Sequence, residues 1–193
     1  MNNAFVPLEF ASDEDLLALY ARGDPRAAKQ LTLRLAPAVL RLASNLMPDK
    51  ADAEDITQEA FLRLWKIAPN WERGQAKVST WLWKVTANLC TDWHRKKKNA
   101  SLDEIDEPAD GRPTNEARLM DHDRAKALKR ELLNLPIRQR TAVAMRHLEG
   151  FSNPEIAVAM GLSVEAVESL TARGMKTLRR NLIGEKAELG WDQ

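Results

Sequence analysis

The chain has 193 residues, of which 44% are hydrophobic and 30% are charged, a composition typical of a folded globular protein. This length allows one ordinary domain or two small ones. No apolar run approaches the roughly 18 residues of a membrane span, and the N-terminus lacks the pattern of a signal peptide. We therefore predict a cytoplasmic protein without membrane insertion.

The sequence gives little indication of a metal site or of a disulfide. Cys90 is the only cysteine, so the chain cannot form an internal disulfide, which fits a reducing compartment. The three histidines, His94, His122 and His147, show no metal-ligand spacing among themselves or with Cys90. We expect neither a metal nor a cofactor.

The net charge of +1 conceals an uneven distribution. Residues 84–98 carry five Lys or Arg against one acidic residue, and residues 99–123 carry eight Asp or Glu against two Arg. Residues 163–183 carry four Lys or Arg against two Glu. Two basic stretches around an acidic one predict two surfaces that face nucleic acid, separated by a linker.

The N-terminal part predicts two helices. Residues 1–11 are expected to be a frayed tail. Ser12 caps a short amphipathic helix that ends at Gly23. A second helix starts at Pro25, and Pro37 predicts a kink or a break within it.

An acidic helix is predicted over residues 52–66. At 100° per residue its apolar and polar side chains separate into two arcs, but Leu62 lies in the polar arc. A single exposed leucine needs no explanation. With Asp55, Gln58 and Glu59 around it, Leu62 forms the apolar centre of a surface with a polar rim. We therefore favour a docking surface over a solvated face.

A Trp-rich helix follows an irregular loop at residues 69–77. Trp81 and Trp93 belong to its apolar face and are predicted to pack in the core. A polar and basic stripe about four turns long lies on another face. Trp83 lies beside that stripe, where core packing and stacking on an unpaired base are both open. The stripe contains Lys84, Asn88, Thr91, Arg95 and Lys98.

The C-terminal part predicts a helix-turn-helix unit. Ser152 and Glu155 form a capping box that opens a short helix, Gly161 makes the turn, and Ser163 caps a longer helix. An ordinary helical hairpin is the alternative, but the basic outer face favours DNA. Glu165, Ala166 and Ser169 would face base edges, and Arg173, Lys176 and Arg180 would face phosphates.

No strand period occurs anywhere, so the expected fold is all-α, with two small helical domains.

Together these segments resemble the extracytoplasmic-function sigma factors of bacteria, small promoter-specificity subunits of RNA polymerase. The resemblance covers about residues 12–183, in the order and spacing of the family. The matching residues are Asp52-Ala-Glu-Asp-Ile-Thr-Gln-Glu-Ala-Phe61, Ser79-Thr-Trp-Leu-Trp-Lys-Val-Thr-Ala-Asn88 with Asp92 and Arg95, Leu135-Pro136 with Arg140, and Gly150-Phe-Ser152, Glu155-Ile-Ala157, Gly161-Leu-Ser163, Val167, Ser169, Arg173 and Leu178.

The resemblance implies a domain order: a tail at 1–11, a region-2 domain at 12–98, a flexible acidic linker at 99–118, a region-4 helix-turn-helix domain at 119–185 and a tail at 186–193. It also implies three binding surfaces. The expected protein partner is core RNA polymerase, through its β′ clamp helices and its β subunit. The surface for the clamp helices comprises Asp52, Asp55, Gln58, Glu59 and Leu62. The surface for the −10 element, including a loop that captures a flipped base, comprises Asn70, Trp71, Arg73, Lys77, Thr80, Trp83, Lys84, Asn88, Arg95 and Lys98. The surface for the −35 element comprises Arg140, Ser163, Glu165, Ala166, Ser169, Arg173, Lys176 and Arg180.

Two departures from the family affect DNA binding. Many members carry Lys and Arg where this chain has Glu168 and Leu170, so the electrostatic share of −35 binding is expected to be weaker or redistributed. The −10 loop is variable in the family, which leaves the captured base open. An anti-sigma factor is the expected regulator, with the two domains closing around it and residues 99–118 as the hinge.

Two other readings compete with this one. A stand-alone helix-turn-helix regulator would leave the acidic and Trp-rich helices without a role. A carboxylate-based enzyme would use Glu54, Asp55 and Glu59, but no histidine, metal set, phosphate loop or nucleophile accompanies them. We therefore expect no enzymatic activity.

Overall fold

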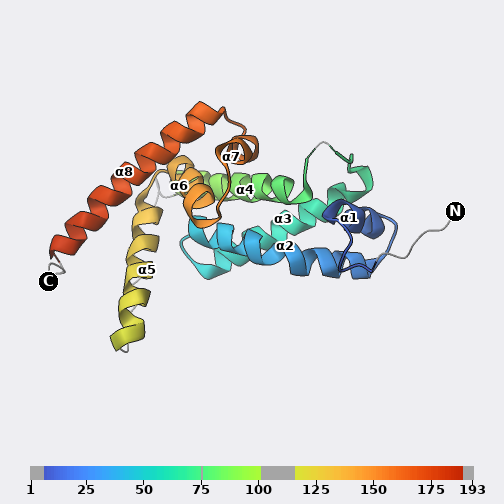
Figure 1. The fold of residues 1–193 in the computed structure, drawn as a ribbon, viewed down its shortest axis with the longest axis horizontal. Coiled ribbons are helices and arrows are strands. Elements are labelled where there is room, and N and C mark those ends of the chain that lie inside the picture. Colours follow the sequence, from blue (N-terminus) through green and yellow to red (C-terminus); the bar gives the residue numbers. More distant parts are fainter. Residues whose placement is uncertain (1–6, 75, 101–115, 189–193) are drawn as a thin grey trace.

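The computed structural model describes residues 7–74, 76–100 and 116–188, and every regular element in these segments is helical (Figure 1). The prediction of an all-α chain is confirmed for the described residues. None of their helices is long and apolar enough to span a membrane. The elements are α1 (Asp13–Ala21), α2 (Pro25–Leu46), α3 (Lys50–Ile67), the 3-10 turn η1 (Ala68–Asn70), α4 (Val78–Ala100), α5 (Glu116–Asn134), α6 (Ile137–Val143), the π-helical turn η2 (Ala144–Leu148), α7 (Asn153–Met160) and α8 (Val164–Glu188).

The helix boundaries narrow the predicted linker. α4 continues to Ala100 and α5 begins at Glu116, so both helices extend into the range 99–118. Residues 101–115, the rest of that linker, lie outside the described residues. At the C-terminus α8 continues to Glu188, within the predicted tail, and residues 189–193 lie outside the described part.

The prediction of a frayed N-terminal tail is wrong for residues 7–11. Arg34 on α2 donates from Nη1 to the carbonyl of Ala11 at 2.9 Å and from Nη2 to the carbonyl of Glu9 at 3.0 Å. The same guanidinium pairs with Asp13 at 2.7 Å. One arginine therefore fixes this segment to the bundle. Residues 1–6 lie outside the described segments.

α2 runs through Pro37 without the predicted break. Proline removes the hydrogen bond to the carbonyl four residues earlier, which here belongs to Leu33. Leu33 is 64% exposed, so water can hydrate that carbonyl and the loss is small. Burial of the opposite side of α2 keeps the helix continuous.

α1 to α4 pack around a core that is rich in leucine. Each buried leucine contributes roughly 1.5–3 kcal/mol, and every one of the four helices supplies at least one. This core holds α3 and α4 side by side. The fully buried leucines are Leu16, Leu17, Leu31, Leu42, Leu46, Leu64 and Leu82.

The C-terminal helix-turn-helix forms as predicted. Ser152 and Glu155 make the reciprocal capping box at the start of α7, and Gly161 ends that helix with φ 62° and ψ 43°, a left-handed conformation that glycine adopts without strain. Further along α8, Gly174 lies at the crossing with α6. A Cβ added there would come within 2.6 Å of Val143 Cγ2, so the crossing depends on glycine.

The two halves of the chain share one hydrophobic core. Met145 and Phe151 from the C-terminal half pack in the same cluster as Leu46 at the end of α2, and α7 packs against α4 (Figure 1). Glu149, whose side chain is only 5% exposed, pairs with Arg41 of α2 at 3.2 Å. In this structure the C-terminal domain is therefore closed onto the N-terminal one.

Candidate nucleic-acid and protein interfaces

The acidic face of α3 presents an apolar side chain within a polar rim. Leu62 is 62% exposed, and Asp55 and Gln58 are exposed beside it. Glu59 accepts a hydrogen bond from Arg63 Nε at 2.7 Å. Such an exposed pair within one helix is weak, so both side chains can turn to a partner.

A groove next to Leu62 was not foreseen from the sequence. It has a volume of about 320 Å³ and lies between α2 and α3. Its apolar part is assembled from two helices, so no single helical period could have revealed it. The groove is lined by Thr32, Ala36, Thr57, Gln58, Phe61, Leu62 and Trp65.

Asp52 differs from the rest of the predicted polymerase-docking set. It is half-buried and accepts a hydrogen bond from Trp93 Nε1 at 3.2 Å. Burial raises the pKa of the Asp52 carboxyl, and the neighbouring Asp49 carboxylate adds to this increase. In this structure Asp52 joins α3 to α4 instead of facing solvent.

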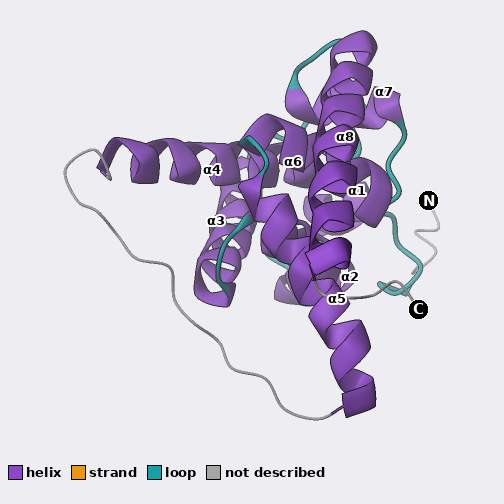
Figure 2. Cartoon of the chain, turned by 90° about the vertical axis from the view of Figure 1, so that its left-hand side faces the viewer, coloured by secondary structure: helices purple, strands orange, loops and turns teal. Residues whose placement is uncertain are grey.

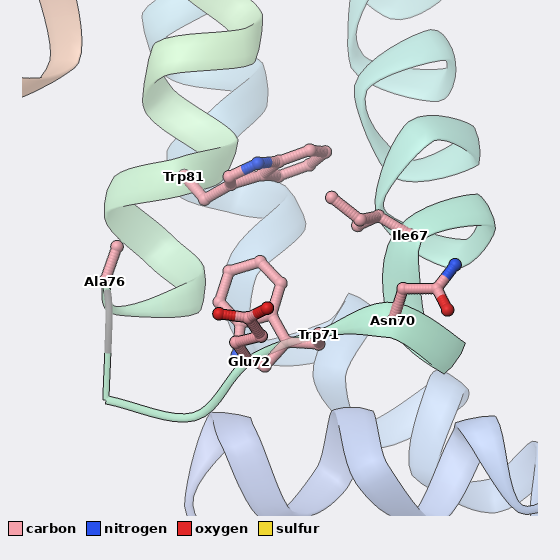
Figure 3. A pocket seen from close by; sticks show the side chains of 6 residues that line it. All are labelled: Ile67, Asn70, Trp71, Glu72, Ala76 and Trp81. Carbon is pink, nitrogen blue, oxygen red and sulfur yellow. The ribbon is translucent and has the colours of Figure 1, made fainter.

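The loop between α3 and α4 encloses a pocket of about 330 Å³ (Figure 3). Trp71 and Trp81 meet edge to face, with ring centroids 6.1 Å apart. The Trp71 indole Nε1 is buried and has no hydrogen-bond partner among the described residues, and a buried donor of this kind needs an explanation. The described residues that line it are Ile67, Asn70, Trp71, Glu72, Ala76 and Trp81.

α1 holds this loop in place. Arg73 Nη2 donates to Asp15 Oδ1 at 2.6 Å, and the backbone N–H of Gly74 donates to Glu14 Oε1 at 3.4 Å. Gly74 has φ +83°, which favours glycine. Arg73 was predicted to contact DNA, but in this structure its guanidinium forms an exposed pair with Asp15 of α1.

The polar stripe of α4 is open to solvent along part of its length. Lys84 and Asn88 are exposed, and Arg95, also exposed, pairs with Asp92 at 3.0 Å. The C-terminal end of α4, with its basic run, projects beyond the rest of the bundle (Figure 2). Of the other predicted −10 residues, Lys77 is exposed and Thr80 is half-buried, whereas the side chain of Lys98 lies outside the described ones.

Trp83 is not free to face DNA in this structure. Its ring lies 3.9 Å, centroid to centroid, from the ring of Phe151, which comes from the turn before α7. The helical period placed Trp83 beside the basic stripe, but the C-terminal domain covers that position. Core packing and base stacking were both left open for Trp83, and in this structure Trp83 packs in the core.

The outer face of α8 carries the predicted row of polar and basic side chains. Glu165, Ser169, Lys176 and Arg180 are exposed, as is Arg173, which donates from Nη2 to Ser169 Oγ at 2.8 Å.

At the start of α8, Ser163 Oγ accepts from the backbone N–H of the half-buried Ala166 at 3.2 Å, which confirms the cap. Glu168 accepts from Asn153 Nδ2 at 3.2 Å. One of the two residues that depart from the family pattern thus joins α8 to α7.

Arg140 does not belong to the −35 surface in this structure. It is only 5% exposed and donates to the Leu46 carbonyl at 2.7 Å, to the Leu135 carbonyl at 3.2 Å and to the Leu133 carbonyl. Burial lowers the pKa of Arg140 to about 10. The guanidinium joins the C-terminal end of α2 to the end of α5, and sequence periodicity could not indicate this because the partners are backbone carbonyls.

His94 completes this buried polar cluster. Its Nε2 lies 2.9 Å from the Leu46 carbonyl and 3.1 Å from Arg140 Nη1. A neutral ring can donate to the carbonyl or accept from the guanidinium, depending on its tautomer. Burial lowers the pKa of His94, and Arg140 and Lys97 lower it further, against an opposing effect of the Leu46 carbonyl.

Comparison with known families matches both halves of the chain. Residues 31–100 match Sigma-70 region 2, and residues 125–178 match Sigma-70, region 4.

Several curated relatives align over most of their length. The extracytoplasmic-function RNA polymerase sigma factor SigM of Mycobacterium tuberculosis is 33% identical over 174 residues, which cover 89% of this chain and 85% of SigM. The RNA polymerase sigma-E factor of Streptomyces coelicolor is 35% identical over 149 residues, covering 76% and 80% of the two chains.

Solved structures show the same fold. CnrH, in complex with the cytosolic domain of CnrY, matches with a TM-score of 0.63 and 25% identity over 95% of this chain and 100% of CnrH. The sigma factor RpoE of Bartonella quintana, in complex with the anti-sigma factor NepR, matches with a TM-score of 0.66 and 23% identity over 80% and 95% of the two chains.

Proposed function

The chain belongs to the extracytoplasmic-function family of RNA polymerase sigma factors, and we propose that it binds core RNA polymerase in the bacterial cytoplasm and directs it to specific promoters. It would act as a non-catalytic specificity subunit. The observation that carries this proposal is the presence of both sigma regions in one chain, each with its own exposed binding surface. A stand-alone DNA-binding regulator would need only the second region.

The docking surface for core polymerase would be the exposed face of α3. Leu62 supplies the apolar centre, Asp55, Gln58 and Glu59 supply the polar rim, and the neighbouring groove can receive an apolar side chain. This composition resembles that of many protein interfaces, in which a few apolar contacts carry most of the affinity. Asp52 would act indirectly by orienting α3 against α4.

The −10 element would bind as single strand at the start of α4. The loop pocket, with two tryptophan rings in its lining, offers stacking surface for an unpaired base. Lys77, Lys84 and Asn88 are exposed nearby, where phosphates of the same strand could be contacted. Arg95 and the basic end of α4 would extend this contact along the DNA.

The −35 element would bind as duplex on α8. The N-terminal residues of a recognition helix contact base edges in the major groove, which assigns Glu165, Ala166 and Ser169 to readout. Arg173, Lys176 and Arg180 would contact phosphates and set the register without reading sequence.

Promoter binding would require the two domains to separate. In the closed arrangement Phe151 covers Trp83, and α7 packs against α4, the helix that would bind the −10 strand. An anti-sigma factor could keep the protein inactive by favouring the closed arrangement. The protein partner seen on the similar CnrH supports such regulation.

Run-off transcription tests the proposed function. Purified protein and core polymerase would be assayed on a pool of genomic promoters, with Leu62→Asp as the test variant. Phe10→Asp is the matched control because Phe10 is 76% exposed and lies before α1, outside the proposed docking set. We expect specific initiation by wild type and by the control, and its loss in Leu62→Asp with an unchanged circular dichroism spectrum. Specific duplex binding without any initiation would instead indicate a stand-alone regulator.

A further inference from the structure

One backbone carbonyl at the boundary between the two domains is approached by two side-chain nitrogens. Arg140 of α6 donates from Nη1 to the Leu46 carbonyl at 2.7 Å, and His94 of α4 places Nε2 2.9 Å from the same oxygen. The two nitrogens lie 3.1 Å from each other. Leu46 and His94 belong to the N-terminal domain and Arg140 to the C-terminal one, so this carbonyl links the domains.

The arrangement requires a neutral imidazole. A neutral ring keeps one nitrogen free of a proton and carries no charge, whereas an imidazolium has a proton on both nitrogens. After protonation, His94 Nε2 could only donate to the Leu46 carbonyl, and two cations would then share one acceptor. Arg140 cannot relieve this repulsion by losing its own proton, because its pKa of about 10 keeps it charged at neutral and acid pH.

We propose that protonation of His94 opens the contact between the two domains, so that mild acidification uncovers α4. The imidazolium keeps the Leu46 carbonyl, which lies in its own domain, and displaces Arg140, which comes from the other domain. The opening itself goes beyond the proposed function and does not depend on it. Its effect on promoter binding rests on that function.

The charged groups on the surrounding elements favour this outcome. Burial lowers the pKa of His94, and Arg140 and Lys97 lower it further, against the opposing effect of the Leu46 carbonyl. The Cys90 thiol stays neutral, because burial raises its pKa to about 12. Acidic side chains on the neighbouring elements are held by other partners. These pairs are Asp49 with the backbone N–H of Asp52, Asp52 with Trp93, Asp92 with Arg95, Glu131 with Asn181, and Glu149 with Arg41.

The size of the effect follows from one proton. When Arg140 withdraws, the pKa of His94 returns toward its ordinary value of about 6.5. The closed form therefore binds fewer protons than the open form, and the closed-to-open ratio falls as the pH drops below about 6.5. A single proton limits this fall to about 10-fold per pH unit. We expect a decrease of at least about 3-fold between pH 7.5 and pH 5.5.

Thiol labelling of full-length protein measures the opening. Met145 is fully buried in the core shared by the two domains, so Met145→Cys places a thiol that reacts only after opening, and Cys90→Ala leaves this thiol alone. The labelling rate is compared with and without His94→Gln at each pH, which cancels the reactivity of the thiol. His147→Gln is the matched control, because it removes an exposed histidine.

We expect the rate with His94, relative to His94→Gln, to increase at least 3-fold from pH 7.5 to pH 5.5, and His147→Gln to leave this increase unchanged. A ratio that does not change would overturn the inference, because His94→Gln retains every carboxylate that acid could protonate. Proton NMR gives a second measurement without a variant at His94. A His94 ring that titrates at or above the pH at which the exposed His147 titrates would also overturn the inference.

Run-off transcription with core polymerase and limiting protein measures the consequence for promoters. We expect initiation by wild type, relative to His94→Gln, to increase at least 2-fold from pH 7.5 to pH 6.0. An unchanged ratio with active polymerase would refute the release of α4 for DNA. Absence of initiation by wild type at both pH values would refute the proposed function, and the labelling ratio would still decide whether His94 opens the domains.

Discussion

Phe151→Ala should open the contact between the two domains. The Phe151 side chain is 8% exposed and packs against Trp83 of the other domain. The substitution leaves the backbone hydrogen bond from Phe151 to the Met145 carbonyl, at 3.0 Å, in place. Phe→Ala in a core costs about 3–5 kcal/mol, of which the aromatic pair supplies roughly 0.5–1.5 kcal/mol. If about 2 kcal/mol falls on the domain contact, the closed-to-open ratio decreases roughly 30-fold.

Energy transfer between two dyes measures this change. Lys66→Cys on α3 and Arg179→Cys on α8 place one label on each domain, and both positions are exposed. The native Cys90 does not compete, because it is fully buried and burial raises its thiol pKa to about 12. We expect lower transfer in Phe151→Ala and no change in Phe10→Ala, which removes an exposed phenylalanine. Equal transfer in all three proteins, each with an intact helical spectrum, would refute the closed arrangement in solution.

Three further predictions concern the same packing. Gly174→Ala should lower the free energy of unfolding by about 1 kcal/mol, because the clash with Val143 costs about 1–3 kcal/mol and the gain in helix propensity returns about 1 kcal/mol. Thermal melting measures the change in stability, and a stabilised variant would contradict the tight crossing of α6 and α8. Since the pKa of His94 is lowered in the closed structure, its contribution to closure is complete above pH 6.5 and lost as pH falls through the lowered value. Energy transfer should therefore decrease on acidification, and His94→Gln should flatten that profile. Arg140→Lys should destabilise the closed protein by about 1–3 kcal/mol in denaturant unfolding, since an ammonium lacks the planar fork with which two guanidinium nitrogens reach carbonyls of two helices. Unchanged stability would argue against the role of the guanidinium.

Local features could be predicted from the sequence because they depend on neighbouring residues alone. The capping box at Ser152, the glycine turn at Gly161 and the cap at Ser163 each need only a few consecutive residues. The exposure of Leu62 also follows from one helical period. These features, with the order of the matching segments, were sufficient to indicate the fold class and the family.

Contacts between distant segments could not be obtained in this way. Trp83 and Arg140 were assigned to DNA from their helical position and from family resemblance, but in the closed structure each is covered by residues far away in the sequence. The pocket beside Glu72 likewise needs the end of α3, the loop and the start of α4 together. Sequence by itself determined the helices, their caps and the polar faces, because these depend on local periodicity. Only the tertiary structure decided which of those faces remain open to solvent, because burial depends on how the two domains pack.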